Sequence, residues 1–254
     1  MIGVYDSGLG GLGVLRALRK RMPRADLLYL GDTLHLPYGE KPPGVLQNYA
    51  EQAFAFFEKQ AISALVVACG TVSATVLESG RPCAHRYPIF GVVRPAAERA
   101  LALGCRRIAV LATEATVKSG VYSRLLRQGR AEQLSLGCPS LVPLAESRAA
   151  CRSDRRFMRE IEAELSPLRD FSPDAIILGC THFPLFAECI GELYPSAVLI
   201  DCGAAALDAL PARLFEVGGG ESTYCVTGSP ELFRASAERM GLLDRRETVR
   251  KVRL

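Results

Sequence analysis

Seven short apolar runs recur along the chain and constrain its fold more than any other feature of the sequence. They are IGVY (2–5), DLLYL (26–30), ALVVA (64–68), IFGVV (89–93), RIAVLA (107–112), AIIL (175–178) and AVLI (197–200). Continuous apolar runs of this length are typical of parallel strands that are covered on both faces. Each run is therefore predicted to form a buried strand.

Segments with helical periodicity separate these runs. In residues 45–57 the apolar side chains form one stripe at three- and four-residue intervals: Leu46, Tyr49, Ala50, Ala53, Phe54 and Phe57. A second stripe follows Leu12, Leu15 and Leu18. Strands that alternate with helices predict an α/β fold with parallel sheets and right-handed crossovers.

The composition limits the class of protein. The chain has 254 residues, of which 49% are hydrophobic and 23% charged, as in an ordinary soluble protein of one large or two modest domains. Its net charge of +4 is small and its arginines are spread along the chain, so no nucleic-acid partner is implied. The C-terminal segment RRETVRKVRL (245–254) is predicted to be a solvated tail.

The sequence predicts neither a membrane protein nor an exported one. Its longest uncharged stretch, residues 60–77, is interrupted by Gln, Ser, Thr and Gly, which fits a buried strand with its loop better than a membrane span. The N-terminal MIGVYD lacks the basic start and apolar core of an export signal. Nine cysteines without regular spacing predict reduced thiols, so we expect a cytoplasmic protein.

Two segments echo one another about half a chain apart. ALVVACGT (64–71) and AIILGCTH (175–182) both lead from an apolar strand into a cysteine that is followed by small or polar residues. Open α/β sheets bind ligands at the carboxyl edge of their strands. The echo therefore predicts two pseudo-symmetric α/β lobes whose facing edges bring Cys69 and Cys180 to one cleft.

Several other roles for these cysteines have to be weighed. A buried cysteine usually packs as a small hydrophobe, which is the prediction for the remaining seven: Cys83, Cys105, Cys138, Cys151, Cys189, Cys202 and Cys225. A zinc site would need three or four ligands, and besides His182 only His35 and His85 are available. A Cys–His nucleophile pair stays open, although two residues so close in sequence rarely adopt that geometry. None of the five lysines follows an apolar strand, so a pyridoxal phosphate site is not indicated.

The glycine-rich start offers a different class of function. Gly8, Gly10 and Gly13 satisfy the pattern G-x-G-x-x-G between a strand and a helix, and Asp32 ends the next strand. This is the fingerprint of a dinucleotide-binding turn. Asp6 and Ser7 precede the first glycine, which would bring a carboxylate close to a bound pyrophosphate. This counts against dinucleotide binding, because both groups are negatively charged. A nucleotide-binding α/β protein that uses the 8–13 loop remains the alternative.

A set of motifs resembles one known family. DSGLGGL (6–12), GDT with PYG (31–39), ACGTVSA (68–74), TEATVKSGVY (113–122) and GCTHFPL (179–185) are similar to the glutamate racemases of the aspartate/glutamate racemase superfamily, and the similarity extends over nearly the whole chain. The resemblance implies a first lobe of residues 1–95 plus 206–254 and a second lobe of residues 96–205, with the active-site cleft between them. It also implies interconversion of L- and D-glutamate without cofactor or metal, which supplies D-glutamate for peptidoglycan and so for cell-wall biogenesis and cell shape. We expect a homodimer that acts on glutamate in the cytoplasm.

The resemblance assigns roles to individual residues. Cys69 matches the base that takes the α-proton from D-glutamate, and Cys180 matches the base for L-glutamate. Asp6 and His182 match groups that assist these thiols, and Glu146 matches a further acidic group near the second. The expected substrate contacts are Ser7, Tyr38, Gly39, Gly70, Thr71, Thr113 and Thr181. The chemistry agrees, because inversion of a carbon centre requires proton removal on one face and delivery on the other.

One position departs from the family pattern. The family motif reads Cys-Asn-Thr, whereas this chain has Gly70 between Cys69 and Thr71. Loss of the amide would remove a hydrogen bond to the substrate's carboxylate, so Gly70→Asn is expected to improve glutamate kinetics roughly 10- to 100-fold. Aspartate therefore stays open as the substrate.

Overall fold

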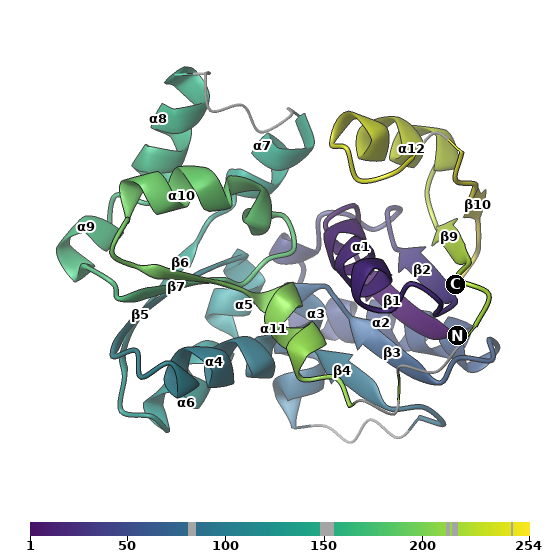
Figure 1. Cartoon of the computed structure of the whole chain (residues 1–254), viewed down its shortest axis with the longest axis horizontal. Helices are drawn as coiled ribbons and strands as arrows, with labels where there is room; N and C mark the ends of the chain where they lie inside the picture. Colours follow the sequence, from purple (N-terminus) through teal and green to yellow (C-terminus); the bar gives the residue numbers. More distant parts are fainter. Residues whose placement is uncertain (81–84, 148–154, 212–213, 215–217, 245) are drawn as a thin grey trace.

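Two parallel sheets form the centre of the molecule, as the apolar runs predict. The computed structural model describes residues 1–80, 85–147, 155–211, 214, 218–244 and 246–254. Within these ranges all strands pair in parallel, in one sheet of six strands and one of four. Figure 1 shows the two sheets side by side, each with helices packed against it.

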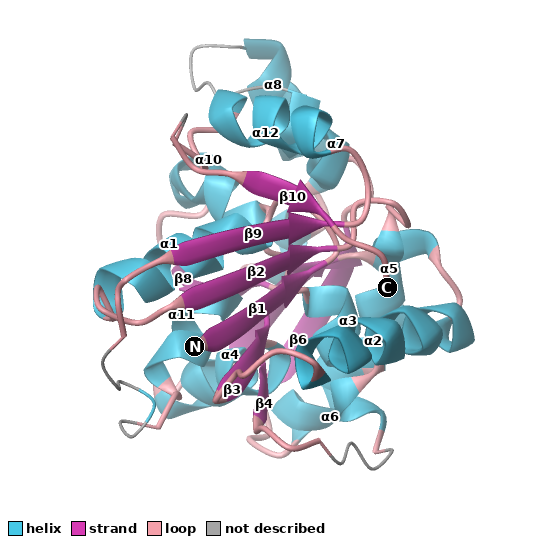
Figure 2. Ribbon diagram, turned by 90° about the vertical axis from the view of Figure 1, so that its right-hand side faces the viewer, coloured by secondary structure: helices cyan, strands magenta, loops and turns pink. Residues whose placement is uncertain are grey.

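The six-stranded sheet lies between two layers of helices (Figure 2). Its strands, in spatial order, are β10 (Val249–Lys251), β9 (Ser222–Val226), β2 (Leu27–Gly31), β1 (Ile2–Asp6), β3 (Ala64–Val67) and β4 (Ile89–Gly91). Successive side chains of a strand point to opposite faces, so one set packs with α1 (Gly11–Arg21) and α12 (Pro230–Arg239). The other set packs with α2 (Pro43–Glu58) and α3 (Gly70–Thr75).

The four-stranded sheet is covered in the same way. Its order is β6 (Glu132–Gly137), β5 (Arg107–Ala112), β7 (Ala175–Leu178) and β8 (Val198–Asp201). One face packs with α4 (Val93–Ala102), α6 (Val121–Arg127) and α11 (Cys202–Asp208). The other face packs with α7 (Leu141–Ser147), α8 (Arg155–Glu164), α9 (Leu168–Phe171) and α10 (Ala187–Leu193). The short elements are α5 (Glu114–Lys118), η1 (Tyr38–Glu40), η2 (Leu77–Ser79) and η3 (Phe183–Phe186).

The two sheets repeat one topology. The order β2-β1-β3-β4 in the first corresponds to β6-β5-β7-β8 in the second. The strand order reverses between β1 and β3 in the first sheet and between β5 and β7 in the second. Open α/β sheets form their ligand crevices at such a switch point. Asp6 and Cys69 therefore lie at one switch point, and Thr113 and Cys180 lie at the other.

The predicted lobe boundaries fall inside two helices. The break at 95/96 lies within α4 and the break at 205/206 lies within α11. Both helices contribute to the apolar cluster that covers the four-stranded sheet. The division into two lobes at those residues stays a prediction.

All seven apolar runs form strands, with ends that shift by one or two residues. The amphipathic stripes also form the predicted helices, α2 and α1. Arg246, Arg250 and Arg253 of the C-terminal segment are exposed, as predicted. The prediction of a tail was wrong for residues 249–251, which pair as β10 with β9 at the edge of the sheet. Among the described helices, none has the length and apolar character needed to cross a bilayer.

Candidate active site

The first part of the site lies where β1 ends. Asp6 is fully buried, and its Oδ2 accepts a hydrogen bond from Gly8 N at 3.0 Å. Thr181 of the other sheet donates its hydroxyl to Asp6 Oδ1 at 3.4 Å. A Cβ at Gly11 would lie 2.5 Å from Asp6 Cβ, so glycine there allows α1 to begin against the carboxylate. The Asp6 carboxylate is therefore buried beneath the turn that joins β1 to α1.

Cys69 follows β3 and immediately precedes α3. Its side chain is 4% exposed, and its Sγ lies 3.6 Å from Ser7 Oγ. Burial and the Asp6 carboxylate raise the pKa of the Cys69 thiol to about 12, against smaller opposing contributions from the Val72 backbone and Ser7. Cys69 is therefore a protonated thiol at neutral pH, able to donate a proton.

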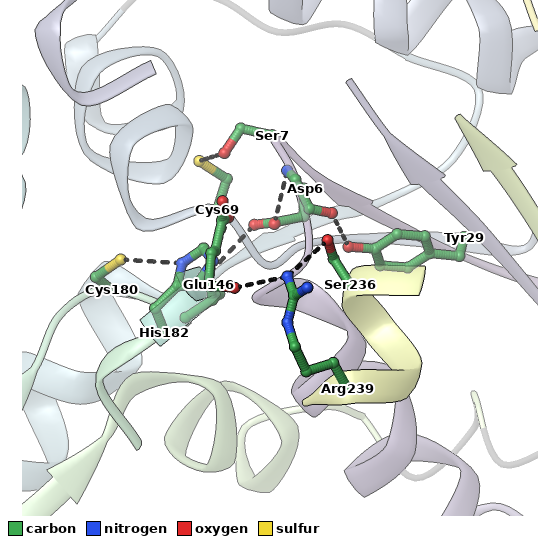
Figure 3. A network of polar contacts seen from close by, with 11 residues as sticks. Asp6, Ser7, Tyr29, Cys69, Glu146, Cys180, His182, Ser236 and Arg239 are labelled. Carbon is green, nitrogen blue, oxygen red and sulfur yellow. Dashed lines mark hydrogen bonds and ion pairs between the residues drawn. The ribbon is translucent and has the colours of Figure 1, made fainter. Parts of the chain in front are cut away.

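Cys180 follows β7 and has a different neighbour. Its Sγ lies 3.8 Å from His182 Nδ1, and His182 Nε2 lies 3.0 Å from Glu146 Oε1 (Figure 3). Burial acts to lower the pKa of His182, but its hydrogen bonds to Cys180 and Glu146 outweigh burial and raise that pKa to about 10. At neutral pH His182 therefore carries a positive charge beside the Cys180 sulfur.

Both thiols border one cavity of about 300 Å³ between the two sheets. This volume is at the lower end of the range for small-molecule sites. Its lining includes eleven of the twelve residues that the sequence indicated: Ser7, Tyr38, Gly39, Cys69, Gly70, Thr71, Thr113, Glu146, Cys180, Thr181 and His182. Asp6, the twelfth, does not line the cavity and reaches it only through its neighbours.

Two threonine hydroxyls that border the cavity join the two lobes. Thr71 Oγ1 and Thr113 Oγ1 are 2.9 Å apart, one from α3 and the other from the start of α5. Thr113 also caps α5, since its Oγ1 accepts a bond from Thr116 N. These hydroxyls can each donate and accept a hydrogen bond, which suits a ligand carboxylate or ammonium.

The hydroxyl of Tyr38 is committed away from a ligand. It donates to Asp32 Oδ2 at 2.5 Å and lies 2.8 Å from Tyr5 Oη. Asp32 is itself fully buried and also accepts the hydroxyl of Thr227 at 2.6 Å and a bond from His35 Nδ1 at 2.8 Å. Asp32 therefore anchors the η1 segment that lines the cavity.

This arrangement leaves the glycine pattern with a packing role. A Cβ at Gly10 would lie 2.2 Å from Thr181 Oγ1 and 2.8 Å from His182 Nδ1, so the other lobe covers the turn. Asp32, the acidic residue of the fingerprint, is enclosed by side chains and is not open to a ribose. The geometry does not support a dinucleotide at this turn.

Sequence reasoning missed part of the lining. The cavity is also bordered by Leu36, Pro37, Glu40, Glu114, Cys138, Pro139, Val142 and Pro143. Cys138 follows β6, a strand without a continuous apolar run, so no strand-end signal marked it.

The core prediction holds for Cys105, Cys138, Cys189, Cys202 and Cys225, which are buried, whereas Cys83 and Cys151 lie outside the described residues. In the described part of the chain, no three His, Cys, Asp or Glu side chains form a group that could hold a metal.

Arg239 links α12 to the same network. Its Nη2 donates to the backbone oxygen of Glu146 at 3.0 Å and to Ser236 Oγ at 3.1 Å (Figure 3). The bond to Glu146 joins α12, which covers the six-stranded sheet, to α7, which covers the four-stranded sheet. The side chain of Glu146 is the carboxylate that contacts His182. This side chain carried no signal in the sequence.

Comparisons with known proteins identify the family of the chain. The Asp/Glu/Hydantoin racemase family matches residues 13–210. The chain is 39% identical over 265 residues to the glutamate racemase of Thermus thermophilus, with 100% of this chain and 96% of the relative covered. A crystal structure of the Thermus thermophilus enzyme in complex with β-chloro-D-alanine aligns with a TM-score of 0.87 at 38% identity, over 100% of this chain and 96% of that one.

A second solved structure, glutamate racemase from Francisella tularensis in complex with D-glutamate, aligns with a TM-score of 0.89 at 29% identity and covers 99% of this chain and 97% of that one. The family match covers most of the chain, and the similarity to single relatives runs from end to end. The chain belongs to the Asp/Glu/Hydantoin racemase family, a family of isomerases.

Proposed function

We propose that this protein is a cofactor-independent glutamate racemase that transfers the α-proton with two cysteines. The observation that carries the proposal is the pair of thiols, Cys69 and Cys180, at equivalent strand ends of two lobes and bordering one cavity. The full-length relatives named glutamate racemase support glutamate as the substrate.

In the L-to-D direction, the Cys180 thiolate removes the α-proton: an S–H bond forms as the Cα–H bond breaks, and the electron pair remains on the substrate carbon. The Cys69 thiol then donates its proton to the opposite face, which leaves D-glutamate and a Cys69 thiolate. The imidazolium of His182 favours the starting thiolate, and the raised pKa of Cys69 favours the starting thiol. Proton exchange with water restores the resting state.

Other residues assist in this proposal. Glu146 holds His182 as a cation through the 3.0 Å contact. Asp6 keeps Cys69 protonated and holds the turn that carries Ser7. The hydroxyls of Ser7, Thr71, Thr113 and Thr181, together with Gly39, Gly70 and Tyr38, form the substrate contacts.

The direct test is circular dichroism of L-glutamate and of D-glutamate incubated with the pure protein, with L-aspartate in parallel. The proposal expects both glutamate signals to decay to zero and to do so after exhaustive EDTA treatment. Faster racemisation of aspartate would reassign the substrate. Activity that depends on added metal or pyridoxal phosphate would contradict the mechanism.

We also propose that the product supplies D-glutamate for peptidoglycan, and that the protein acts as a cytoplasmic homodimer. Expression in a bacterial strain that requires external D-glutamate tests the first point. Growth without D-glutamate is expected from this chain and not from its Cys69→Ala variant. Light scattering coupled to gel filtration tests the assembly, with twice the chain mass expected.

A further inference from the structure

Three glycines of the first lobe meet the second lobe around the cavity. A Cβ at Gly10 would lie 2.2 Å from Thr181 Oγ1, and a Cβ at Gly39 would lie 2.9 Å from Thr113 Cβ. A Cβ at Gly70 would lie 2.2 Å from the carbonyl oxygen of Gly179. Real Cβ atoms do not approach other atoms this closely, so the two lobes contact each other through backbone that carries no side chain.

Gly70 is the strictest of the three contacts. The atoms that face its missing Cβ are backbone atoms, namely Gly179 O at 2.2 Å, Gly179 C at 3.3 Å and Cys180 Cα at 3.7 Å. Rotation of a threonine moves its Oγ1 and Cγ2 but not its Cβ, so it relieves the contacts at Gly10 and Gly39 only in part. The contact at Gly70 is to a backbone carbonyl, which no side-chain rotation can relieve. The glycines with positive φ do not include Gly70, so its backbone conformation does not itself demand glycine.

Gly179 has no room to retreat. Its N–H donates to Leu111 O at 2.8 Å within the sheet. A Cβ at Gly179 would lie 2.9 Å from the same Leu111 oxygen and 3.3 Å from the Tyr122 hydroxyl, so the residue is packed closely against β5 and α6. Relief of a clash at Gly70 would therefore require the two lobes to move apart.

We propose that Gly70 sets the distance to which the two lobes close, and through it the separation of Cys69 and Cys180 across the substrate. Gly70 is thus a positioning residue that adjoins Cys69 in sequence and packs against the residue before Cys180. This inference rests on the proposed function, because the closing distance matters for catalysis only if both thiols act on one carbon. A misplacement of about 1 Å at reacting groups can cost roughly 100-fold in rate.

The proposal reverses the expectation drawn from the sequence. An asparagine at position 70 would have to place its Cβ where the Gly179 carbonyl oxygen lies. Gly70→Asn should therefore hold the lobes apart and lower kcat, although its amide could form the hydrogen bond that the family motif provides.

The experiment compares Gly70→Ala and Gly70→Asn with two other glycine variants. Gly13→Ala is the matched control, because Gly13 is exposed on α1 and nothing lies within 4 Å of an added Cβ. Gly39→Ala is the intermediate case, since the added methyl meets only the Thr113 side chain. For each variant, kcat and KM are measured with both enantiomers, and hydrogen–deuterium exchange is followed in peptides covering residues 8–12 and 179–183.

The proposal expects kcat to fall roughly 10- to 100-fold in Gly70→Ala, with a much smaller change in KM, because a misplaced base acts on the transition state. Exchange in both peptides should rise, Gly39→Ala should show smaller effects, and Gly13→Ala should match the parent. Parental kcat and parental exchange in Gly70→Ala would overturn the proposal, as would a higher kcat/KM in Gly70→Asn. If Gly70→Ala does not fold, parental values in Gly39→Ala would overturn it.

The exchange measurement separates this inference from the proposed function. If the parent does not racemise glutamate, the proposed function fails. A rise in exchange at residues 8–12 and 179–183 in Gly70→Ala would still support closure on Gly70 in that case, and unchanged exchange would refute it.

Discussion

The surroundings of Cys69 and of Cys180 differ in charge, although the two residues lie at equivalent points of the repeated topology. Cys69 is buried near the Asp6 carboxylate and has the Ser7 hydroxyl as its side-chain partner. Cys180 has His182, which Glu146 holds on the other side of the ring. The repeat supplies the positions of the two sulfurs, and the residues that differ between the halves give them neighbours of opposite charge.

This difference matches what inversion requires. One group must begin as a base and the other as an acid, and two thiols in identical surroundings would share one protonation state. Burial and the Asp6 carboxylate raise the pKa of Cys69, whereas Cys180 has the positively charged His182 beside its sulfur. The predictions below test whether the two halves differ in this way.

The largest effect is expected from removal of either sulfur. Cys69→Ala and Cys180→Ala should each lower kcat/KM by on the order of 10³-fold or more, since each removes a proton-transfer group. The loss of kcat/KM must be equal for L-to-D and D-to-L conversion. The two enantiomers have the same free energy in water, so the two values of kcat/KM are equal in every variant. Circular dichroism measures it, and Cys105→Ala, a buried cysteine that does not line the cavity, should keep parental activity. Racemisation by Cys69→Ala at the parental rate would refute the two-base account.

His182→Gln should lower kcat roughly 10- to 100-fold by removing the cation beside Cys180. The pKa of His182 is raised to about 10, so the imidazolium is present at neutral pH and is lost as pH rises through about 10. Its contribution to folding stability is correspondingly complete below about pH 6.5 and is lost by about pH 10. The pH profile of kcat in the L-to-D direction should fall near pH 10 in the parent and lose that step in the variant. Identical profiles would contradict a role for the imidazolium.

Asp6→Asn tests the other half of the comparison. The amide oxygen can still accept from Gly8 N, but the charge that helps to raise the pKa of Cys69 is gone. In a Cys180→Ala background, the rate of Cys69 alkylation by iodoacetamide at fixed pH should rise about tenfold, equivalent to a drop of about one pKa unit. Denatured protein gives the reference rate. A slower or unchanged rate would show that Asp6 does not keep Cys69 protonated.

The smallest effect is expected at Arg239. Arg239→Gln weakens the bond to the backbone of Glu146 and should loosen the carboxylate that contacts His182. Because the guanidinium is exposed, the loss should be at most about 1 kcal/mol, or about fivefold in kcat. Steady-state kinetics measure it, and Ser236→Ala, which leaves the Glu146 contact in place, should change kcat less. A loss larger than that of His182→Gln would mean that Arg239 does more than position α7.

The sequence predicted the buried strands well because their signal is local. All seven apolar runs form strands, whereas β6, β9 and β10 lack a long apolar run and were missed. The strand β10 lies at the edge of its sheet, where residues such as Arg250 and Lys251 remain exposed. An edge strand of this kind looks like a solvated tail in sequence.

The site was predictable to the extent that it depends on strand ends and on motifs. The cysteine echo and the family motifs located the lining residues, but not the contacts between distant segments. Three such contacts are the Asp32 anchor for Tyr38, the Arg239 bond to Glu146 and the approach of Gly70 to Gly179. Each joins residues that no local pattern relates. In sequence, glycine at position 70 reads as a lost hydrogen bond, whereas the structure adds that a Cβ there would lie 2.2 Å from the Gly179 carbonyl oxygen.

The most direct test of the different roles of Cys69 and Cys180 is α-proton exchange in heavy water. It uses the variants Cys69→Ala and Cys180→Ala, each of which keeps only one of these two thiols. Each variant keeps one base on one face of the substrate, so it can remove the α-proton and return deuterium with retention. Proton NMR of the Cα signal should show that Cys69→Ala, which keeps Cys180, exchanges L-glutamate and not D-glutamate. Cys180→Ala should exchange D-glutamate and not L-glutamate. Exchange of the same enantiomer by both variants, or of both enantiomers by either one, would contradict the assignment of one thiol to each face.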